Sequence, residues 1–264
     1  MTMRPPELPV DVLAPGDKTV VWQLPEEIPV AFIYNGLTYA IMLCTPQDIE
    51  DFARGFSVTE RIIDIQSDWL NLEISTRAEG VEVRISIEQN HFDALKLLMS
   101  RRNLPGRSCG VCGLDSETEF FETLKPVAQN ALLLNTGTIV YALEQFETLQ
   151  KLKLSNKSVH GAAWVEFSGD QPYGKVDLVR EDVGRHNALD KLVGALIYAK
   201  RDISLGFLMI SSRCSYDILL KAARSGIRAI VSLSAPTAFA LRKAKEANIS
   251  LYTLTKSGIF RVYP

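Results

Sequence analysis

Residues 206–254 read GFLMISSRCSYDILLKAARSGIRAIVSLSAPTAFALRKAKEANISLYTL, and this stretch decides the fold. Short apolar runs alternate in it with longer segments of helical periodicity. The pattern predicts strands at 206–211, 228–234 and 249–254, with helices at 216–225 and 236–248 between them. Strands and helices that alternate in this way form a mostly parallel sheet with helices on both faces.

The same rhythm extends upstream, where residues 176–180 predict a strand and residues 186–200 a helix. In such sheets, ligands bind beyond the carboxyl ends of the strands. The turns after the predicted strands are polar and contain small residues that let a ligand approach the backbone. They hold Asp182-Val-Gly-Arg-His-Asn187, Ser211-Ser-Arg-Cys-Ser215 and Ser234-Ala-Pro-Thr237.

The N-terminal part of the chain has a different pattern. Two β-rich runs at 28–34 and 37–43 flank Asn35-Gly36, which is typical of a tight hairpin turn. Thr45-Pro46 predicts the start of a helix, with Thr45 as its cap and Pro46 in the first turn. A further strand is predicted at 81–87 and an amphipathic helix at 91–100.

We therefore expect two domains. The first, at 1–130, is a smaller N-terminal α+β lobe with the hairpin and a mobile Cys-x-x-Cys loop, and the second is the α/β domain at 131–264. The first fifteen residues carry four of the twelve prolines and predict an extended, partly ordered arm.

Composition narrows the class of protein. Hydrophobic residues at 47% and charged residues at 23% are ordinary for a globular protein, and a net charge of −2 gives no reason to expect nucleic-acid binding. The first residues lack the apolar core of a signal peptide, and no apolar run approaches the ~18 residues of a membrane span. Four cysteines without an export signal favour the reducing cytoplasm. We therefore expect a cytoplasmic protein with neither a nucleic-acid nor a membrane partner.

The pair Cys109 and Cys112, in Cys-Gly-Val-Cys-Gly, is the strongest chemical signal. Two thiols three positions apart can stabilise each other's thiolate, and Arg107 adds positive charge that lowers a thiol pKa. Gly110 and Gly113 remove side-chain bulk, so a partner's sulfur can approach. This combination suits a persulfide carrier or a dithiol redox site.

Three alternatives fit these cysteines less well. A structural zinc site needs two more ligands, and the chain has no second closely spaced pair. A thioredoxin-like pair would follow a strand and open a helix, whereas this pair lies in a long polar stretch. A zinc deaminase needs His-x-Glu or Cys-x-Glu and a Pro-Cys-x-x-Cys run, and neither is present. We expect no metal.

The run at 181–191 is the densest polar segment. Asp182, Gly184 and Asn187 fit a helix start, whereas Arg185 and His186 beside a helix N-terminus would favour an anion such as phosphate. A structural role for His186 stays open.

Several other polar residues and the two remaining cysteines can be explained by structural roles alone. Arg213 follows an apolar strand and needs a partner, either a phosphate or Asp217. His160 has no obvious partner in the sequence, and Gly161 and Ala162 beside it suggest tight packing. Cys44 and Cys214 stand alone and fit small core residues.

Thr255-Lys-Ser-Gly258 allows two interpretations. It can be a simple hairpin turn that leads into Phe260-Arg-Val-Tyr263, or it can offer backbone N–H groups and Lys256 to a phosphate. The common nucleotide fingerprints, the Walker loop and G-x-G-x-x-G, are absent.

Taken together, these motifs resemble the FdhD-type sulfurtransferases (FdhD/NarQ family), accessory proteins needed to make active formate dehydrogenase. The resemblance covers nearly the whole chain. It is carried by Cys44-Thr-Pro46, Gly55-Phe56, Thr59-Glu60, Cys109-Gly-Val-Cys-Gly113, Glu181-Asp-Val-Gly-Arg-His-Asn-Ala-Leu-Asp-Lys191, Ser212-Arg213, Ser234-Ala-Pro-Thr237 and Val262-Tyr263.

The resemblance implies a fold similar to cytidine deaminase, a three-layer sandwich, without the zinc chemistry. It implies that a cysteine desulfurase passes sulfur to Cys109 as a persulfide, with Cys112 assisting. The sulfur then goes to the molybdenum or tungsten of a bis(molybdopterin guanine dinucleotide) cofactor, a bound substrate that a guanine nucleotide can mimic. The sulfurated cofactor is handed to apo formate dehydrogenase.

The resemblance also implies a site. The family's cofactor-binding stretch corresponds to Leu254, Thr255, Lys256, Ser257, Gly258 and Ile259, and we add His160, Arg185, His186 and Arg213 as further cofactor-binding candidates. A homodimer is expected from family likeness and from the frequency of two-fold dimers. The alternative function is a non-catalytic chaperone that binds the cofactor or the apoenzyme, with the cysteines incidental.

This chain departs from the family pattern in three places. Asn156-Lys-Ser-Val-His160 stands where Thr-Gly-Gly-x-His is common, and Ser211-Ser-Arg213 where Ser-Gly-Arg is usual. In the terminal stretch, Leu254 and Lys256 replace an aromatic residue and an arginine. Lysine keeps the positive charge but loses the forked recognition of phosphate.

Overall fold

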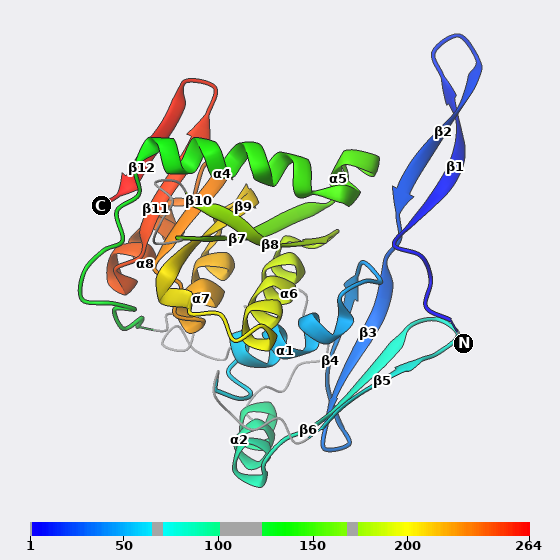
Figure 1. Ribbon diagram of the computed structural model, residues 1–264. Coiled ribbons are helices and arrows are strands. Elements are labelled where there is room, and N and C mark those ends of the chain that lie inside the picture. The colour runs from blue at the N-terminus through cyan, green and yellow to red at the C-terminus, as the bar shows by residue number, and fades with distance from the viewer. Residues whose placement is uncertain (1, 65–70, 101–122, 168–173) are drawn as a thin grey trace.

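The computed structural model describes residues 2–64, 71–100, 123–167 and 174–264 (Figure 1). The described strands form a two-stranded ribbon, a four-stranded sheet and a six-stranded sheet. In chain order the elements are β1 (Glu7–Ala14), β2 (Lys18–Pro25), β3 (Ile28–Tyr34), β4 (Leu37–Cys44), α1 (Ile49–Thr59), β5 (Asn71–Thr76), β6 (Val81–Ser86), α2 (Gln89–Ser100), α4 (Thr136–Leu149), α5 (Lys151–Asn156), β7 (His160–Glu166), β8 (Lys175–Asp182), α6 (Arg185–Tyr198), the 3₁₀ turn Ile203–Leu205, β9 (Gly206–Arg213), α7 (Tyr216–Arg224), β10 (Ala229–Ser234), α8 (Ala238–Ala247), β11 (Ser250–Thr255) and β12 (Gly258–Tyr263).

The four-stranded N-terminal sheet has the order β4-β3-β6-β5. The predicted hairpin is confirmed, because β3 and β4 pair antiparallel and Asn35 and Gly36 have φ values of 45° and 85°, as a tight turn of this kind requires. Helix α1 covers one face of the sheet. Phe32 of β3 stacks on Phe56 of α1 with ring centroids 4.4 Å apart, which anchors the core of this lobe.

The prediction for the start of α1 is wrong. The helix begins at Ile49, after Asp48 in the left-handed region, and not at Thr45-Pro46. Thr45 is buried against the C-terminal half of the chain. Its N–H donates to Asp182, 137 positions later, and its hydroxyl accepts from the Val183 N–H at 3.1 Å. A long-range contact therefore occupies the groups that a local cap would have used.

The six-stranded C-terminal sheet has the order β12-β11-β10-β9-β7-β8. The predicted alternation from β8 to β11 is confirmed, but the prediction of a mostly parallel sheet is wrong. β9, β10 and β11 are parallel, whereas β7, β8 and β12 join through antiparallel pairs. The chain between β7 and β8, and between β11 and β12, is too short for the crossover that a parallel pair needs.

Helices cover both faces of this sheet, so the second half of the chain has three layers. Trp164, Leu208 and other alternate strand residues pack with α6, α7 and α8, and their neighbours Val165 and Phe207 pack with α4 on the other face. Figure 1 shows α4 across one side of the sheet and α6 and α7 on the other. The fold is mixed α/β, and the specific likeness to cytidine deaminase stays a prediction.

Helices α1 and α6 pack at glycines. A Cβ atom on Gly55 would collide with the Asp190 carbonyl, and one on Gly194 would collide with the Asp51 carbonyl. Close by, the Lys221 ammonium lies 2.9 Å from Asp190, so this crossing carries a buried ion pair as well. The two halves are thus joined closely, and a domain boundary near residue 130 stays a prediction.

The prediction of an extended N-terminal arm is confirmed for residues 7–14, which form strand β1, but this segment is paired and not a lone, partly ordered arm. β1 and β2 form a regular antiparallel ribbon from Glu7↔Pro25 to Ala14↔Lys18. Figure 1 shows this ribbon pointing away from the rest of the chain. No helix in the described ranges is both long and apolar enough to cross a membrane.

Candidate functional site

Four strands of the C-terminal sheet end at the same edge, which we call the carboxyl edge. β10 is parallel to β9 and β11, and β8 points the same way as β9 because both pair antiparallel with β7. β7 runs in the opposite direction, so its first residue, His160, lies at this edge opposite Asp182. All the cofactor-binding candidates of the sequence lie along the carboxyl edge: His160, Arg185, His186, Arg213 and residues 254–259.

Asp182, the last residue of β8, organises the start of α6. Its Oδ1 accepts hydrogen bonds from the Gly184 N–H at 2.8 Å and the Asn187 side-chain amide at 2.9 Å. Its Oδ2 accepts the Thr45 N–H and lies 2.7 Å from the Lys191 ammonium. The side chain is completely buried. Asp182 and Asn187 therefore hold the fold at the predicted helix start, but they do not cap the helix: Gly184 is its N-cap residue, and no side chain makes a cap bond.

Arg185 and His186 are the first residues of α6, where the helix dipole favours a negative charge. The His186 Nε2 atom lies 3.7 Å from Asp217 Oδ2, which is too far for a hydrogen bond. Burial, and then the positive charge of Arg185, lowers the pKa of His186 to about 4. The imidazole is therefore neutral near pH 7 and can either donate or accept at Nε2.

His160 is the second histidine at the carboxyl edge. Burial lowers its pKa, and the charge of Arg185 acts in the same direction. The next residue, Gly161, donates its N–H to the Ser211 hydroxyl at 2.8 Å, and a Cβ on Gly161 would collide with the Gln150 side chain. The tight packing predicted around Gly161 is confirmed, and it fixes His160 in place.

Three buried polar atoms at the starts of α6 and α7 have no hydrogen-bond partner among the described residues. They are Arg185 Nε, His186 Nε2 and Ser215 Oγ. Ser215 precedes α7 as its N-cap residue, yet its hydroxyl makes no cap bond. Because buried polar atoms are normally paired, this corner suits a polar ligand that supplies the missing partners.

Arg213 ends β9 as an exposed side chain, and no ion pair joins it to a carboxylate in the described part of the chain. Asp217, which the sequence offers as its partner, faces His186 instead. The backbone beside Arg213 is fixed, because the Ser232 hydroxyl donates to the Ser212 carbonyl at 2.8 Å. Arg213 is thus an available cation on a rigid strand end.

The terminal stretch is a hairpin turn between β11 and β12, as one of the two interpretations predicts. Leu254 and Ile259 face each other across the two strands and pack on the side covered by α4. Residues 255–258 are exposed, and the Thr255 hydroxyl accepts the Ser257 N–H at 3.1 Å. Within this stretch, the Lys256 ammonium and the turn backbone are the groups open to a ligand.

The two ends of the carboxyl edge are well separated. Four strand spacings of ~4.8 Å lie between β8 and β11, so the turn at 255–258 is roughly 19 Å from the start of α6. A small anion cannot contact both. An extended ligand with several phosphate groups can lie along the edge and contact Arg185, Arg213 and Lys256 in turn.

Two of the four cysteines are excluded from sulfur chemistry by their surroundings. Cys44 and Cys214 are free thiols with no exposed surface, and burial raises the pKa of each to about 12. The prediction that they are small core residues is confirmed. Cys109 and Cys112, with the mobile loop predicted around them, lie outside the described residues.

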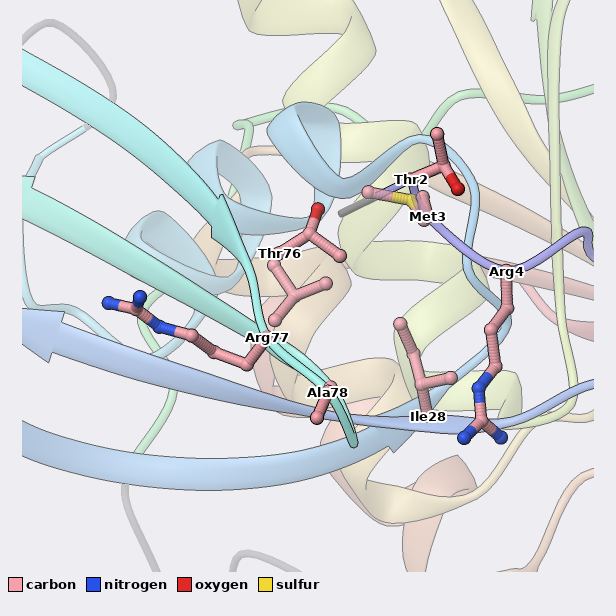
Figure 2. Close-up of a pocket in the computed structure, with 9 residues that line it drawn as sticks. Thr2, Met3, Arg4, Ile28, Thr76, Arg77 and Ala78 are labelled. Carbon is pink, nitrogen blue, oxygen red and sulfur yellow. The ribbon is translucent and has the colours of Figure 1, made fainter.

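A cavity of about 400 Å³ lies in the N-terminal lobe, between the N-terminal segment and the turn that joins β5 to β6 (Figure 2). Arg4 and Arg77 lie at its rim. Arg4 is 3.3 Å from Glu79, and Arg77 is 2.8 Å from Glu82. Since carboxylates already pair with both cations, this cavity is a poor anion site.

Sequence reasoning missed two members of the candidate site. The sequence shows Ser215 only as part of a polar turn and Asp217 only as a possible partner for Arg213, whereas in the structure both lie at the start of α7 and Asp217 faces His186. The available signal was the spacing Ser-x-Asp directly after a strand and before a helix, which is typical of a helix N-terminus.

The fold and the carboxyl edge define a class: a mixed α/β protein with a candidate polar ligand site at the strand ends, in a chain whose sequence also carries a Cys-x-x-Cys pair. The FdhD/NarQ family model matches residues 25–264, and the chain belongs to this family.

Relatives named sulfur carrier protein FdhD support the assignment. The protein from Cupriavidus necator is 43% identical over 242 residues, which cover 91% of this chain and 81% of that protein. The protein from Xanthomonas euvesicatoria pv. vesicatoria is 43% identical over 246 residues, 93% of this chain and 85% of that protein.

A solved structure supports the fold. The crystal structure of a proposed formate dehydrogenase accessory protein from Desulfotalea psychrophila superposes with a TM-score of 0.69 and covers 98% of this chain and 96% of its own. At 20% identity this likeness concerns the fold alone.

Proposed function

We propose that this chain is a sulfur carrier for formate dehydrogenase. It accepts persulfide sulfur on Cys109 from a cysteine desulfurase and transfers it to the metal of a bis(molybdopterin guanine dinucleotide) cofactor. The observation that carries the proposal is the family match over residues 25–264, together with curated relatives of 43% identity that are named sulfur carriers.

The distribution of cysteines supports this chemistry. The chain has four, and Cys44 and Cys214 are too deeply buried to react. Sulfur transfer therefore falls to Cys109 and Cys112. In the first step, the Cys109 thiolate attacks the outer sulfur of the desulfurase persulfide. The S–S bond of the donor breaks, a new one forms on Cys109, and the donor cysteine leaves as a thiolate.

The carboxyl edge is where we place the cofactor, as a bound substrate. Arg185 and the unpaired Nε2 of His186 lie at one end of this edge, Arg213 lies along it and Lys256 lies at the other end. This spread of cations suits a ligand with two nucleotide arms. His160 and the turn at 254–259 complete the set, with Leu254 and Ile259 shaping the turn by packing.

The partners follow from the same chemistry. The proposed donor is a cysteine desulfurase, the class of enzyme that presents sulfur as a persulfide to an attacking thiolate. The acceptor of the finished cofactor is apo formate dehydrogenase. We propose the cytoplasm as the compartment, since Cys109 must stay a reduced thiol to accept sulfur and a reducing compartment keeps it so.

The test is mass spectrometry of peptides after the reduced protein has been incubated with a cysteine desulfurase and free cysteine. We expect a dithiothreitol-sensitive gain of one sulfur atom on the peptide that holds Cys109 and Cys112. Cys109→Ala should lose the gain, whereas Cys214→Ala, which removes a buried thiol, should keep it.

A second readout separates the carrier from a chaperone. Cys109→Ala should still bind a guanine nucleotide but should fail to activate apo formate dehydrogenase. If the wild-type peptide gains no sulfur from an active desulfurase, or if Cys109→Ala activates normally, the carrier function is wrong and a non-catalytic chaperone takes its place.

A further inference from the structure

A carboxylate and an imidazole face each other at the corner where α6 and α7 begin. Asp217 lies in the first turn of α7, and its Oδ2 is 3.7 Å from the Nε2 atom of His186, the second residue of α6. Within the described ranges, only its own backbone N–H donates a hydrogen bond to this carboxylate, although its side chain is just 26% exposed. Asp217 is therefore a largely buried carboxylate with room to accept further hydrogen bonds.

The charges at this corner determine which kind of group fits between the two side chains. Burial raises the pKa of Asp217, which shows that its charged form lacks the stabilisation it would have in water. A phosphate placed between Asp217 and the neutral His186 would meet the like charge of the carboxylate. A neutral group that donates hydrogen bonds would instead satisfy the carboxylate. The space between Asp217 and His186 thus suits an uncharged part of a ligand.

The buried atoms that lack a partner at this corner complete a hydrogen-bonding pattern. The Nε–H of Arg185 is a donor, whereas Nε2 of the neutral His186 and the Ser215 hydroxyl can each donate or accept. Together with Asp217, the corner offers donors next to the two acceptor oxygens of a carboxylate. The matching ligand edge has a carbonyl, a ring N–H and an amino group in a row, which is the edge of a 2-amino-4-oxopyrimidine ring.

We propose that Asp217 is the residue that selects this ring edge, by accepting its N–H and amino hydrogens on the two carboxylate oxygens. The inference rests on the proposed function, because the bis(molybdopterin guanine dinucleotide) cofactor carries the same edge on its guanine and on its pterin rings. Paired hydrogen bonds to a charged group are strong and geometrically specific. Adenine has an acceptor nitrogen where guanine has the ring N–H, so its lone pair would face the carboxylate. Asp217 therefore determines specificity for the ring.

The position of Asp217 on the carboxyl edge agrees with this role. Arg213 is the last residue of β9, and Asp217 follows it in the first turn of α7. β11, which leads to Lys256, lies two strand spacings of ~4.8 Å from β9, or roughly 10 Å. A ring held at Asp217 therefore lets the phosphates extend towards Arg213 and Lys256. This orientation keeps the phosphates on the cations and away from the carboxylate.

The first experiment is isothermal titration calorimetry of the full-length protein with nucleoside diphosphates that differ only in the base. IDP, which lacks the 2-amino group, should bind about 10-fold more weakly than GDP, and ADP about 100-fold more weakly. Asp217→Asn should weaken GDP binding by about 30-fold or more. It should strengthen binding of XDP, which has a carbonyl in place of the 2-amino group, by at least about 10-fold, because the new amide can donate. This gain also shows that the variant is folded. The matched control is Asp17→Asn, an exposed aspartate in the turn between β1 and β2, which should bind as wild type does.

The second experiment distinguishes the two rings of the cofactor, with neopterin as the pterin probe. If Asp217→Asn weakens only GDP, the corner holds guanine, and if it weakens only neopterin, the corner holds the pterin; both results support selection of the shared edge. Equal affinity of wild type for GDP, IDP and ADP, or an Asp217→Asn variant that binds GDP and neopterin as wild type does, would overturn the inference.

Neither of these results bears on the persulfide on Cys109, which has its own test by mass spectrometry. Conversely, a protein that gains no sulfur but selects GDP through Asp217 would overturn the carrier function and keep this inference. The failure of one proposal is thus distinguishable from the failure of the other.

Discussion

The Lys191 ammonium lies 2.7 Å from a carboxylate oxygen of Asp182, and both side chains are completely buried. The same ammonium donates to the Thr45 carbonyl at 2.9 Å. Lys191 therefore joins the end of β8 to the loop that leads into α1, and it does so with a charge that has no access to water. Removal of one partner from such a buried pair strongly destabilises the protein, because the other charge is left buried without a counter-charge.

Lys191→Met should destabilise the protein by about 3–5 kcal/mol, because it leaves the Asp182 carboxylate buried without its counter-charge. Urea denaturation at pH 7 measures the loss as a fall in the free energy of unfolding. Lys245→Met, which changes an exposed lysine of α8, should stay within about 0.5 kcal/mol of wild type. Equal stabilities of the two variants would show that the pair contributes nothing to the fold.

How far the sequence predicts the fold depends on whether the cause is local. The Asn35-Gly36 turn and the elements from β8 to β11 follow from turn chemistry and periodicity, and both predictions are confirmed. The role of Thr45 depends on Asp182, 137 positions away, so no local pattern shows it. The insertion of β7 between β8 and β9 is likewise a matter of strand order, which periodicity does not encode.

The contact between α1 and α6 leads to a second stability prediction. Gly194→Ala should destabilise the protein by more than about 3 kcal/mol, because the new Cβ collides with the backbone carbonyl of Asp51 and backbone yields less easily than side chains. Gly137→Ala is the control, since Gly137 is exposed in the first turn of α4, and it should be neutral or stabilising by up to about 1 kcal/mol. Thermal or urea unfolding of both variants decides the matter. If Gly194→Ala were as stable as wild type, helices α1 and α6 would have to be able to move apart to make room for the new Cβ.

The sequence predicts the candidate site only in part, for a similar reason. Arg185, His186 and Arg213 can be selected because they follow predicted strands, and the structure brings them to one edge. That Asp217 faces His186 depends on how α6 and α7 lie side by side, which the sequence does not show. Cys109 lies outside the described residues, so its role stays a prediction from the Cys-x-x-Cys motif and from the family.

The buried His186 makes stability depend on pH. Its pKa is near 6.5 in an unfolded chain and about 4 in the folded protein, because burial disfavours the charged form. Between these two values the unfolded chain binds a proton that the folded protein does not, so the free energy of unfolding falls as pH falls from 6.5 towards 4. The contribution of His186 amounts to about 2 kcal/mol of lost stability by pH 5.

His186→Gln removes this contribution while it keeps a polar side chain. Its free energy of unfolding should therefore fall by about 2 kcal/mol less than that of wild type between pH 7 and pH 5. Urea titrations at the two pH values provide the comparison, and the imidazole NMR signal of His186 should titrate below pH 5. Parallel pH profiles for the two proteins would contradict a neutral, buried His186.

Cations spread along the carboxyl edge predict how a guanine nucleotide binds. GDP carries the guanine nucleotide portion of the proposed cofactor, and its phosphates should contact Arg213 or Lys256 through charge-assisted hydrogen bonds. Arg213→Gln and Lys256→Gln should each weaken GDP binding by about 10-fold, measured by isothermal titration calorimetry. Lys245→Gln should not, because α8 leads into the start of β11, at the opposite edge of the sheet. Cys109→Ala should also bind normally, since the cations proposed to hold the phosphates are other side chains. Unchanged affinity in both edge variants would move the nucleotide site away from the carboxyl edge.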